Sequence, residues 1–116
     1  MAATLYGIRN CDTVKRARAW LDARGLAYHF HDYKSEGIDA ARLEGWIAEF
    51  GWEKVLNRAG TTFRKLPEGD KAGLDAAKAS RLMLAQPSMI KRPLLDVGDR
   101  RLLGFNEAAW AAALGD

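Results

Sequence analysis

The segment Thr4–Leu21, TLYGIRNCDTVKRARAWL, contains the strand-to-helix corner from which the fold is predicted. It opens with a short apolar run that is interrupted by a glycine, a pattern typical of a buried strand. Asn10, Asp12 and Thr13 then supply helix-capping side chains, and from Val14 onward the apolar residues recur with a helical period. The single cysteine of the sequence, Cys11, is therefore predicted to lie where a strand ends and a helix begins.

The position of Cys11 favours a reactive thiol. Unpaired backbone N–H groups and the positive end of the helix dipole converge at a helix start, and both stabilise a thiolate. The alternative is an inert thiol, because most free cysteines are buried and behave as small apolar residues. The polar neighbours of Cys11 and the cation Lys15 favour reactivity, whereas the adjacent carboxylate of Asp12 opposes it. We predict that Cys11 is a nucleophile.

Composition limits the class of protein. The 116 residues are enough for one domain, and 48% hydrophobic and 28% charged residues are ordinary for a globular protein. A single cysteine forms no intrachain disulfide, and neither a signal peptide nor a membrane-spanning stretch is evident, so we expect a cytoplasmic protein without a membrane partner. The net charge is +3, and the basic residues are not interleaved with aromatic ones, so no nucleic-acid partner is expected. His29 and His31 share a strand face without a nearby third ligand, so no metal site is expected.

The remaining pattern predicts a strand–helix–strand unit followed by helices, a hairpin and a last helix. Alternation over residues 28–33 indicates a second strand, parallel to the first. After a loop at 35–39, a helix is expected with an apolar stripe at Leu43, Trp46, Ile47 and Phe50. Further helices are expected at 52–56 and about 75–86, loops at 60–62 and 67–70, and a β-hairpin from strands at 94–97 and 101–103. The last helix, 106–114, is expected to be capped by Asn106 and to turn Phe105, Ala109 and Ala112 inward. We expect one domain, 1–116, with a helical insertion at approximately 39–87.

This order of elements, with a cysteine at the first helix and Pro93 at the entry of the third strand, resembles a thioredoxin fold. More closely, the chain resembles the ArsC/Spx family of arsenate-reductase-like proteins, including its YffB-type members. The resemblance covers essentially the whole chain and is carried by residues 6–15 (YGIRNCDTVK), 55–58 (VLNR) and 82–95 (LMLAQPSMIKRPLL). It implies an α/β, thioredoxin-like fold with a helical insertion between the β-α-β unit and the C-terminal β-hairpin plus helix.

The resemblance also implies features of the site. A cis peptide bond is implied between Arg92 and Pro93, and Arg58 and Arg92 are implied to converge on Cys11. Three positions depart from relatives. Gly104 aligns with a third arginine of the arsenate reductases, Gly7 replaces their histidine, and Val14 stands where Spx regulators typically have a second cysteine. The loss of one charge-assisted contact to an oxyanion costs about 1.5–3 kcal/mol.

The resulting functional prediction is a glutathione-dependent thiol–disulfide reductase with a single nucleophilic cysteine, Cys11. Glutathione would be a co-substrate, with no bound cofactor, and the protein would be a monomer. The residues expected to bind glutathione or the substrate are Asn10, Asp12, Thr13, Lys15, Arg58, Arg92 and Pro93. Two alternatives are an arsenate or other oxyanion reductase, and a non-catalytic, Spx-like regulator that binds RNA polymerase as a protein partner.

Overall fold

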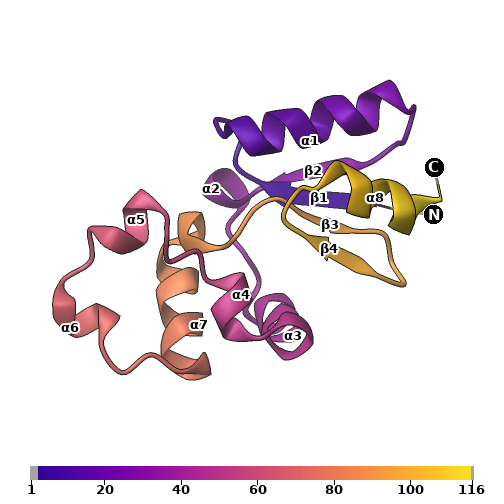
Figure 1. Ribbon diagram of the computed structural model, residues 1–116. Coiled ribbons are helices and arrows are strands. Elements are labelled where there is room, and N and C mark those ends of the chain that lie inside the picture. Colours follow the sequence, from indigo (N-terminus) through magenta and orange to yellow (C-terminus); the bar gives the residue numbers. More distant parts are fainter. Residues whose placement is uncertain (1–2, 116) are drawn as a thin grey trace. The chain divides into compact units, whose positions relative to one another are not determined.

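The computed structural model describes residues 3–115, which contain one mixed four-stranded sheet and several helices (Figure 1). Strand β1 (Thr4–Gly7) pairs in parallel with β2 (His29–Asp32) and antiparallel with β3 (Leu94–Asp96), which pairs antiparallel with β4 (Arg101–Leu103). The strand order is β2-β1-β3-β4, and helix α1 (Asp12–Ala23) connects the two parallel strands. The predicted thioredoxin-like fold is confirmed.

The chain forms two compact units. The sheet unit comprises residues 3–32 and 92–115, with helices α1 and α8 (Glu107–Leu114), and the helical unit comprises Tyr33–Lys91. No helix in the described part of the chain is long and apolar enough to cross a membrane. The helical unit begins before and ends after the expected insertion, 39–87, and the assignment of one domain stays a prediction. Its elements are α2 (Tyr33–Glu36), α3 (Ala40–Phe50), α4 (Trp52–Val55), α5 (Thr61–Arg64), α6 (Glu68–Lys71), α7 (Ala76–Ala85) and the 3-10 helix η1 (Pro87–Met89).

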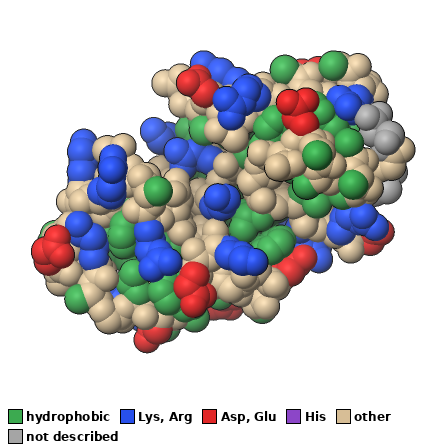
Figure 2. Space-filling view, in the orientation of Figure 1, with side chains coloured by type: hydrophobic (Ala, Val, Ile, Leu, Met, Phe, Trp, Pro, Cys, Tyr) green, Lys and Arg blue, Asp and Glu red, His purple; other side chains and the backbone are tan. Residues whose placement is uncertain are grey.

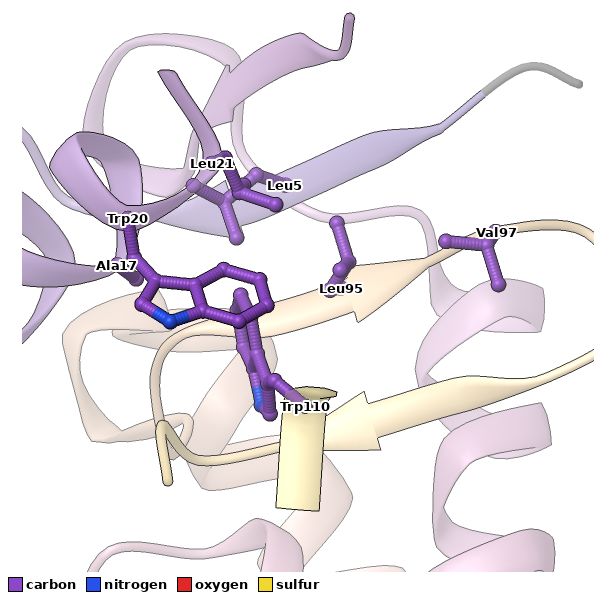
Figure 3. Close-up of a cluster of buried hydrophobic side chains, with 7 residues drawn as sticks. All are labelled: Leu5, Ala17, Trp20, Leu21, Leu95, Val97 and Trp110. Atoms are coloured by element: carbon purple, nitrogen blue, oxygen red, sulfur yellow. The ribbon is translucent and has the colours of Figure 1, made fainter. Parts of the chain in front are cut away.

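The sheet unit has a hydrophobic core between the sheet and two helices (Figure 3). Leu5 and Leu95 face each other across β1 and β3, and helix α1 covers them with three residues. Trp110 of α8 completes this core; its ring lies edge-on to Trp20, with centroids 5.9 Å apart and an interplanar angle of 86°. The core residues are Leu5, Ala17, Trp20, Leu21, Leu95, Val97 and Trp110.

Helix α8 corrects one prediction and confirms another. Ala109 and Ala112 were expected to face inward, but both are exposed and Trp110 is the buried residue of this helix. The reason is size, because burying one indole removes far more apolar surface from water than burying two methyl groups. The predicted cap is confirmed, since the Asn106 side chain accepts a hydrogen bond from the Ala109 N–H at 2.9 Å.

The helical unit is tied together by backbone hydrogen bonds at its ends. Leu56 and Ile90 form an antiparallel bridge, and the Asn57 N–H donates to the Met89 carbonyl at 2.8 Å. The Lys91 N–H donates to the Val55 carbonyl at 2.8 Å. These bonds connect residues 55–57, just before Arg58, with residues 89–91 at the end of η1 and after it.

Two segments predicted as loops are short helices, α5 and α6, so the loop prediction was wrong there. The Lys71 ammonium donates to the Arg64 carbonyl at 3.0 Å, and the Lys78 ammonium donates to the carbonyls of Gly69 and Ala72. Glycine, proline and threonine favour loops locally, but each segment closes one helical turn through its own backbone. The Lys65 N–H donates to the Thr61 carbonyl at 3.1 Å, and the Ala72 N–H donates to the Glu68 carbonyl at 3.0 Å.

Candidate active site

Cys11 occupies the N-cap position of α1. Its φ and ψ of −139° and 122° are those of extended backbone, and the Lys15 N–H donates to its carbonyl at 2.9 Å. The sequence predicted Asn10, Asp12 and Thr13 as the capping residues. That prediction was wrong, because the N-cap residue is Cys11 itself. The sulfur therefore lies at the helix terminus where the backbone N–H groups of the first turn have no carbonyl partners within the helix.

Three groups make Cys11 more acidic than an ordinary thiol. Partial burial raises the pKa of Cys11, but the Val14 backbone N–H, the Arg92 side chain and the Thr13 backbone N–H together lower it by more. Arg92 contributes both a hydrogen bond to the sulfur and the attraction of its positive charge. The net pKa of Cys11 lies below its ordinary value, which increases the thiolate fraction at neutral pH.

Arg92 is held in place by the loop that leads into β3. The Arg92–Pro93 peptide bond is cis, as the family resemblance implied. The carbonyl of Pro93, a buried residue, accepts a hydrogen bond from the Gly104 N–H at 2.8 Å. The Gly104 carbonyl in turn accepts one from the Trp110 indole N–H at 3.0 Å. A chain of hydrogen bonds thus connects the core tryptophan to the loop that carries Arg92.

The structure brings together part of the predicted site. Arg92 interacts directly with Cys11, and Thr13 contributes its backbone N–H. Asn10, Asp12 and Lys15 flank Cys11 in the sequence, and all three are exposed. Arg58 belongs to the helical unit, where its guanidinium lies 5.6 Å from the Trp52 ring centroid. Its convergence on Cys11 stays a prediction.

Two contributors to the site were not predicted from the sequence. Val14 was assigned only to the apolar face of the helix, yet its backbone N–H stabilises the thiolate. Trp110 was not singled out, and its hydrogen bond to Gly104 supports the Arg92 loop. Helix-capping geometry was a signal for the first, because N–H groups two and three residues after an N-cap commonly point at the capping side chain.

No metal centre is apparent in residues 3–115, where no three His, Cys, Asp or Glu side chains are grouped to hold an ion. The His31 ring instead lies 4.9 Å from the Tyr6 ring, centroid to centroid. The groups that act on the Cys11 sulfur are the Arg92 guanidinium and the backbone N–H groups of Thr13 and Val14, a set suited to nucleophilic sulfur chemistry.

Replacing Arg92 by lysine should impair the thiol more than the fold. Lysine keeps the positive charge but loses the planar fork that donates several N–H groups. We expect Arg92→Lys to lower the iodoacetamide alkylation rate at neutral pH by about tenfold, since weakening a charge-assisted hydrogen bond by about 1.4 kcal/mol has that effect. The melting temperature should change little. An alkylation rate equal to that of the wild type would assign Arg92 to the ordinary surface charges.

Several known proteins are similar to this chain in sequence and structure. The structure of a YffB protein is 64% identical, covers 97% of this chain and 98% of its own, and superposes with a TM-score of 0.94. The solution structure of an arsenate reductase (ArsC) related protein from Brucella melitensis is 54% identical, covers 98% of this chain and 95% of its own, and has a TM-score of 0.78.

A more distant relative is the global transcriptional regulator Spx from Streptococcus mutans. It is 26% identical over 106 residues, which are 90% of this chain and 77% of the regulator. Residues 6–113 match the model of the ArsC family. This range includes Cys11, Arg92 and all of the described sheet except Thr4 and Leu5 of β1. The chain therefore belongs to the ArsC family.

Proposed function

We propose that this protein is a glutathione-dependent thiol–disulfide reductase with Cys11 as its nucleophile. The observation that carries the proposal is the pairing of Cys11 with Arg92 and two backbone N–H groups at a helix start, which lowers the thiol pKa. The sequence contains one cysteine, so a resolving thiol must come from another molecule. Glutathione is the abundant thiol of a reducing cytoplasm, and we place the protein in that compartment.

The proposed reaction has two exchange steps. In the first, the Cys11 thiolate attacks the glutathione sulfur of a glutathionylated substrate. The Cys11–glutathione disulfide forms, the substrate disulfide breaks, and the substrate thiolate leaves with the electron pair and takes a proton from water. In the second, the thiolate of a second glutathione attacks the bound glutathione sulfur. Oxidised glutathione forms and the Cys11 thiolate is released. In sum, one glutathionylated thiol is reduced and one free glutathione is consumed, and the oxidised glutathione contains that molecule and the glutathione from the substrate.

Binding of glutathione in this proposal depends on its carboxylates and its peptide backbone. Arginine guanidinium groups match carboxylates with bidentate geometry, which supports Arg58 and Arg92 as the carboxylate ligands. The exposed residues Asn10, Asp12 and Lys15, together with the partly buried Thr13, frame the sulfur, and the backbone beside Pro93 would align the peptide. No further cofactor is proposed.

The other proposed partners follow from the surface. Figure 2 shows Lys and Arg side chains interspersed with Asp and Glu on the face in view. We propose no nucleic-acid partner, because the basic residues of the sequence lack the aromatic interleaving typical of nucleic-acid-binding surfaces. We propose a monomer that acts on a disulfide or glutathionylated substrate away from membranes.

The proposal is tested by a coupled assay with purified protein. A glutathionylated peptide is supplied with glutathione, glutathione reductase and NADPH, and oxidation of NADPH is followed. We expect turnover that requires glutathione and gives a Cys11–glutathione adduct by intact-mass measurement when oxidised glutathione is added alone. Absence of both the turnover and the adduct would refute the proposal.

Arsenate or other oxyanion reduction is the second candidate, favoured by the 54% identity to an arsenate reductase related protein. Two positions count against it. Gly104 and Gly7 stand where the arsenate reductases have an arginine and a histidine, so two contacts to an oxyanion are missing. We expect little arsenate turnover by the unmodified protein with glutathione and glutaredoxin supplied, and robust turnover would replace our proposal with this candidate.

Gly104→Arg should strengthen oxyanion binding without restoring turnover. An added guanidinium beside Pro93 supplies a charge-assisted contact. Because Gly104 has a φ of +77°, any side chain there should also lower the free energy of unfolding by about 1–2 kcal/mol. Arsenate or sulfate affinity is measured by calorimetry. The matched control is Gly98→Arg, which adds the same charge at another positive φ, in the hairpin turn; equal affinity gains in both would contradict a specific role for position 104.

A regulator is the third candidate, favoured by the 26% identity to Spx. It belongs to a different class, because it would act by binding RNA polymerase rather than by turnover. Mixing the protein with purified RNA polymerase and measuring complex formation by size-exclusion chromatography distinguishes the two. A stable complex without glutathione-dependent turnover would favour the regulator.

A further inference from the structure

Gly7 is the last residue of β1, and its missing side chain permits a close contact with helix α1. A Cβ atom at this position would lie 2.9 Å from Cγ2 and 3.3 Å from Cγ1 of Val14. Real Cβ atoms essentially never approach another heavy atom as closely as the first distance, so a methyl group would require Val14 to move. Gly7 does not have a positive φ, so its backbone conformation does not require glycine. Glycine is required here because the Val14 side chain approaches this position so closely.

Val14 has little freedom to avoid such a clash. It is fully buried in the first turn of α1, with an exposed fraction of 0%. Its branched Cβ restricts χ1 to essentially one rotamer in a helix. A side chain at position 7 would therefore displace the helical turn and not only the valine side chain. The turn in question is the one that begins at Cys11.

We propose that Gly7 is a positioning residue: it lets Val14 pack directly against strand β1, and this contact holds the first turn of α1, which begins at Cys11, so that the start of the helix stays beside the sulfur. The inference rests on the reactive Cys11 of the proposed function, but not on glutathione or on any substrate. It assigns a role in thiol activation to two residues, one without a side chain and one that is apolar.

The other charged groups around the turn stay the same in the variants that test this inference. On α1 they are Asp12 and Lys15, and Arg92 approaches the sulfur from the segment before β3. Arg9, in the β1–α1 connection, forms an ion pair with Asp32 at the end of β2, with N–O at 3.4 Å. A change in thiol reactivity on substitution at position 7 or 14 would therefore come from the position of the turn and not from altered charge.

The test compares Gly7→Ala, Val14→Ala and the double variant by the pH dependence of iodoacetamide alkylation, with circular dichroism as the measure of folding. In Gly7→Ala the alkylation inflection should move to higher pH, and the rate at neutral pH should fall about threefold to tenfold, as expected when one charge-assisted hydrogen bond is weakened. In the double variant the alanine methyl at position 7 occupies the space that the Val14 methyl groups leave, so the turn keeps a contact with β1 without a clash. The inflection should therefore return toward that of the wild type. A merely structural role would alter stability without moving the inflection.

Gly45→Ala is the matched control, because a Cβ at Gly45 of helix α3 would meet no atom within 4 Å. It should leave the alkylation profile unchanged. An unchanged profile in folded Gly7→Ala, or a double variant as impaired as Gly7→Ala, would overturn the inference. If Gly7→Ala does not fold, the double variant decides. It should fold with an inflection close to that of the wild type, and its failure to fold would show that Val14 is not the obstacle.

Alkylation requires neither glutathione nor a disulfide substrate, so the two proposals can fail separately. A protein without glutathione-dependent turnover whose Gly7→Ala variant still shifts the inflection would refute the proposed function alone. Normal turnover with an unshifted Gly7→Ala profile would refute the positioning role alone.

Discussion

The Cys11→Ser protein is expected to show no glutathione-dependent reduction of a glutathionylated peptide. Disulfide exchange proceeds through a covalent bond between two sulfur atoms, and a serine hydroxyl cannot form that bond. No other residue of the sequence can substitute, because Cys11 is its single cysteine. The measurement is the coupled NADPH assay, and the adduct with oxidised glutathione should be absent from the intact mass spectrum.

The fold should survive this substitution, which separates chemistry from stability. Serine is among the preferred N-cap residues, and position 11 is the N-cap of α1. Because the folded state lowers the pKa of Cys11, the unfolded wild type holds the thiol proton to higher pH. The free energy of unfolding of the wild type should therefore increase with pH from the folded-state pKa of Cys11 up to the ordinary thiol value of about 8.5. As the pH decreases through the folded-state pKa, this contribution is lost. The Cys11→Ser protein should lack this increase in the free energy of unfolding with pH. Residual reduction of the glutathionylated peptide by this variant would contradict the role of Cys11 as the nucleophile.

Trp110→Ala should cause the largest loss of stability, about 3–5 kcal/mol, which is typical of removing a buried aromatic side chain. Trp110 is 1% exposed, and its ring lies edge-on to Phe105, with centroids 4.9 Å apart, as well as to Trp20. Truncation leaves a cavity beside the sheet and removes both aromatic contacts. Urea denaturation followed by circular dichroism measures the change.

Trp110→Phe is the informative comparison, because it keeps an aromatic ring but removes the indole N–H that donates to the Gly104 carbonyl. It should cost less stability than Trp110→Ala. It should nevertheless slow alkylation of Cys11, because the Gly104–Pro93 connection behind Arg92 loses one of its anchors. Equal stabilities of the alanine variant and the wild type would contradict the placement of Trp110 in the core.

The fold was predictable where its signals are local. The apolar run before Cys11, the helical period after Val14 and the Asn106 cap each depend on residues close in sequence, and all three correspond to elements of the structure. Helices α5 and α6 were not predicted, because their glycine, proline and threonine residues favour loops. Their carbonyls also accept bonds that no local pattern indicates: Lys71 of α6 donates to Arg64 of α5, and Lys78 of α7 donates to Gly69 of α6. The burial of Trp110 over its alanine neighbours was likewise decided by the tertiary core.

The site was likewise predictable only where it depends on residues that are adjacent in the sequence. The helix-start position of Cys11 followed from the sequence, because it depends on adjacent residues. The approach of Arg92 to the sulfur did not, since the two residues lie far apart in the chain, and only the family resemblance implied it. The contact between Gly7 and Val14 had no sequence signal, because a close backbone approach leaves a glycine that looks like any other.

The rate of Cys11 alkylation by iodoacetamide, measured against pH in the unmodified protein, tests the central claim most directly. The structure predicts an inflection below that of a free cysteine thiol measured under the same conditions. Burial raises the pKa of Cys11, but the Val14 N–H, the Arg92 side chain and the Thr13 N–H together lower it by more. An inflection at or above that value, in the folded protein, would contradict the account of Cys11 as an activated nucleophile.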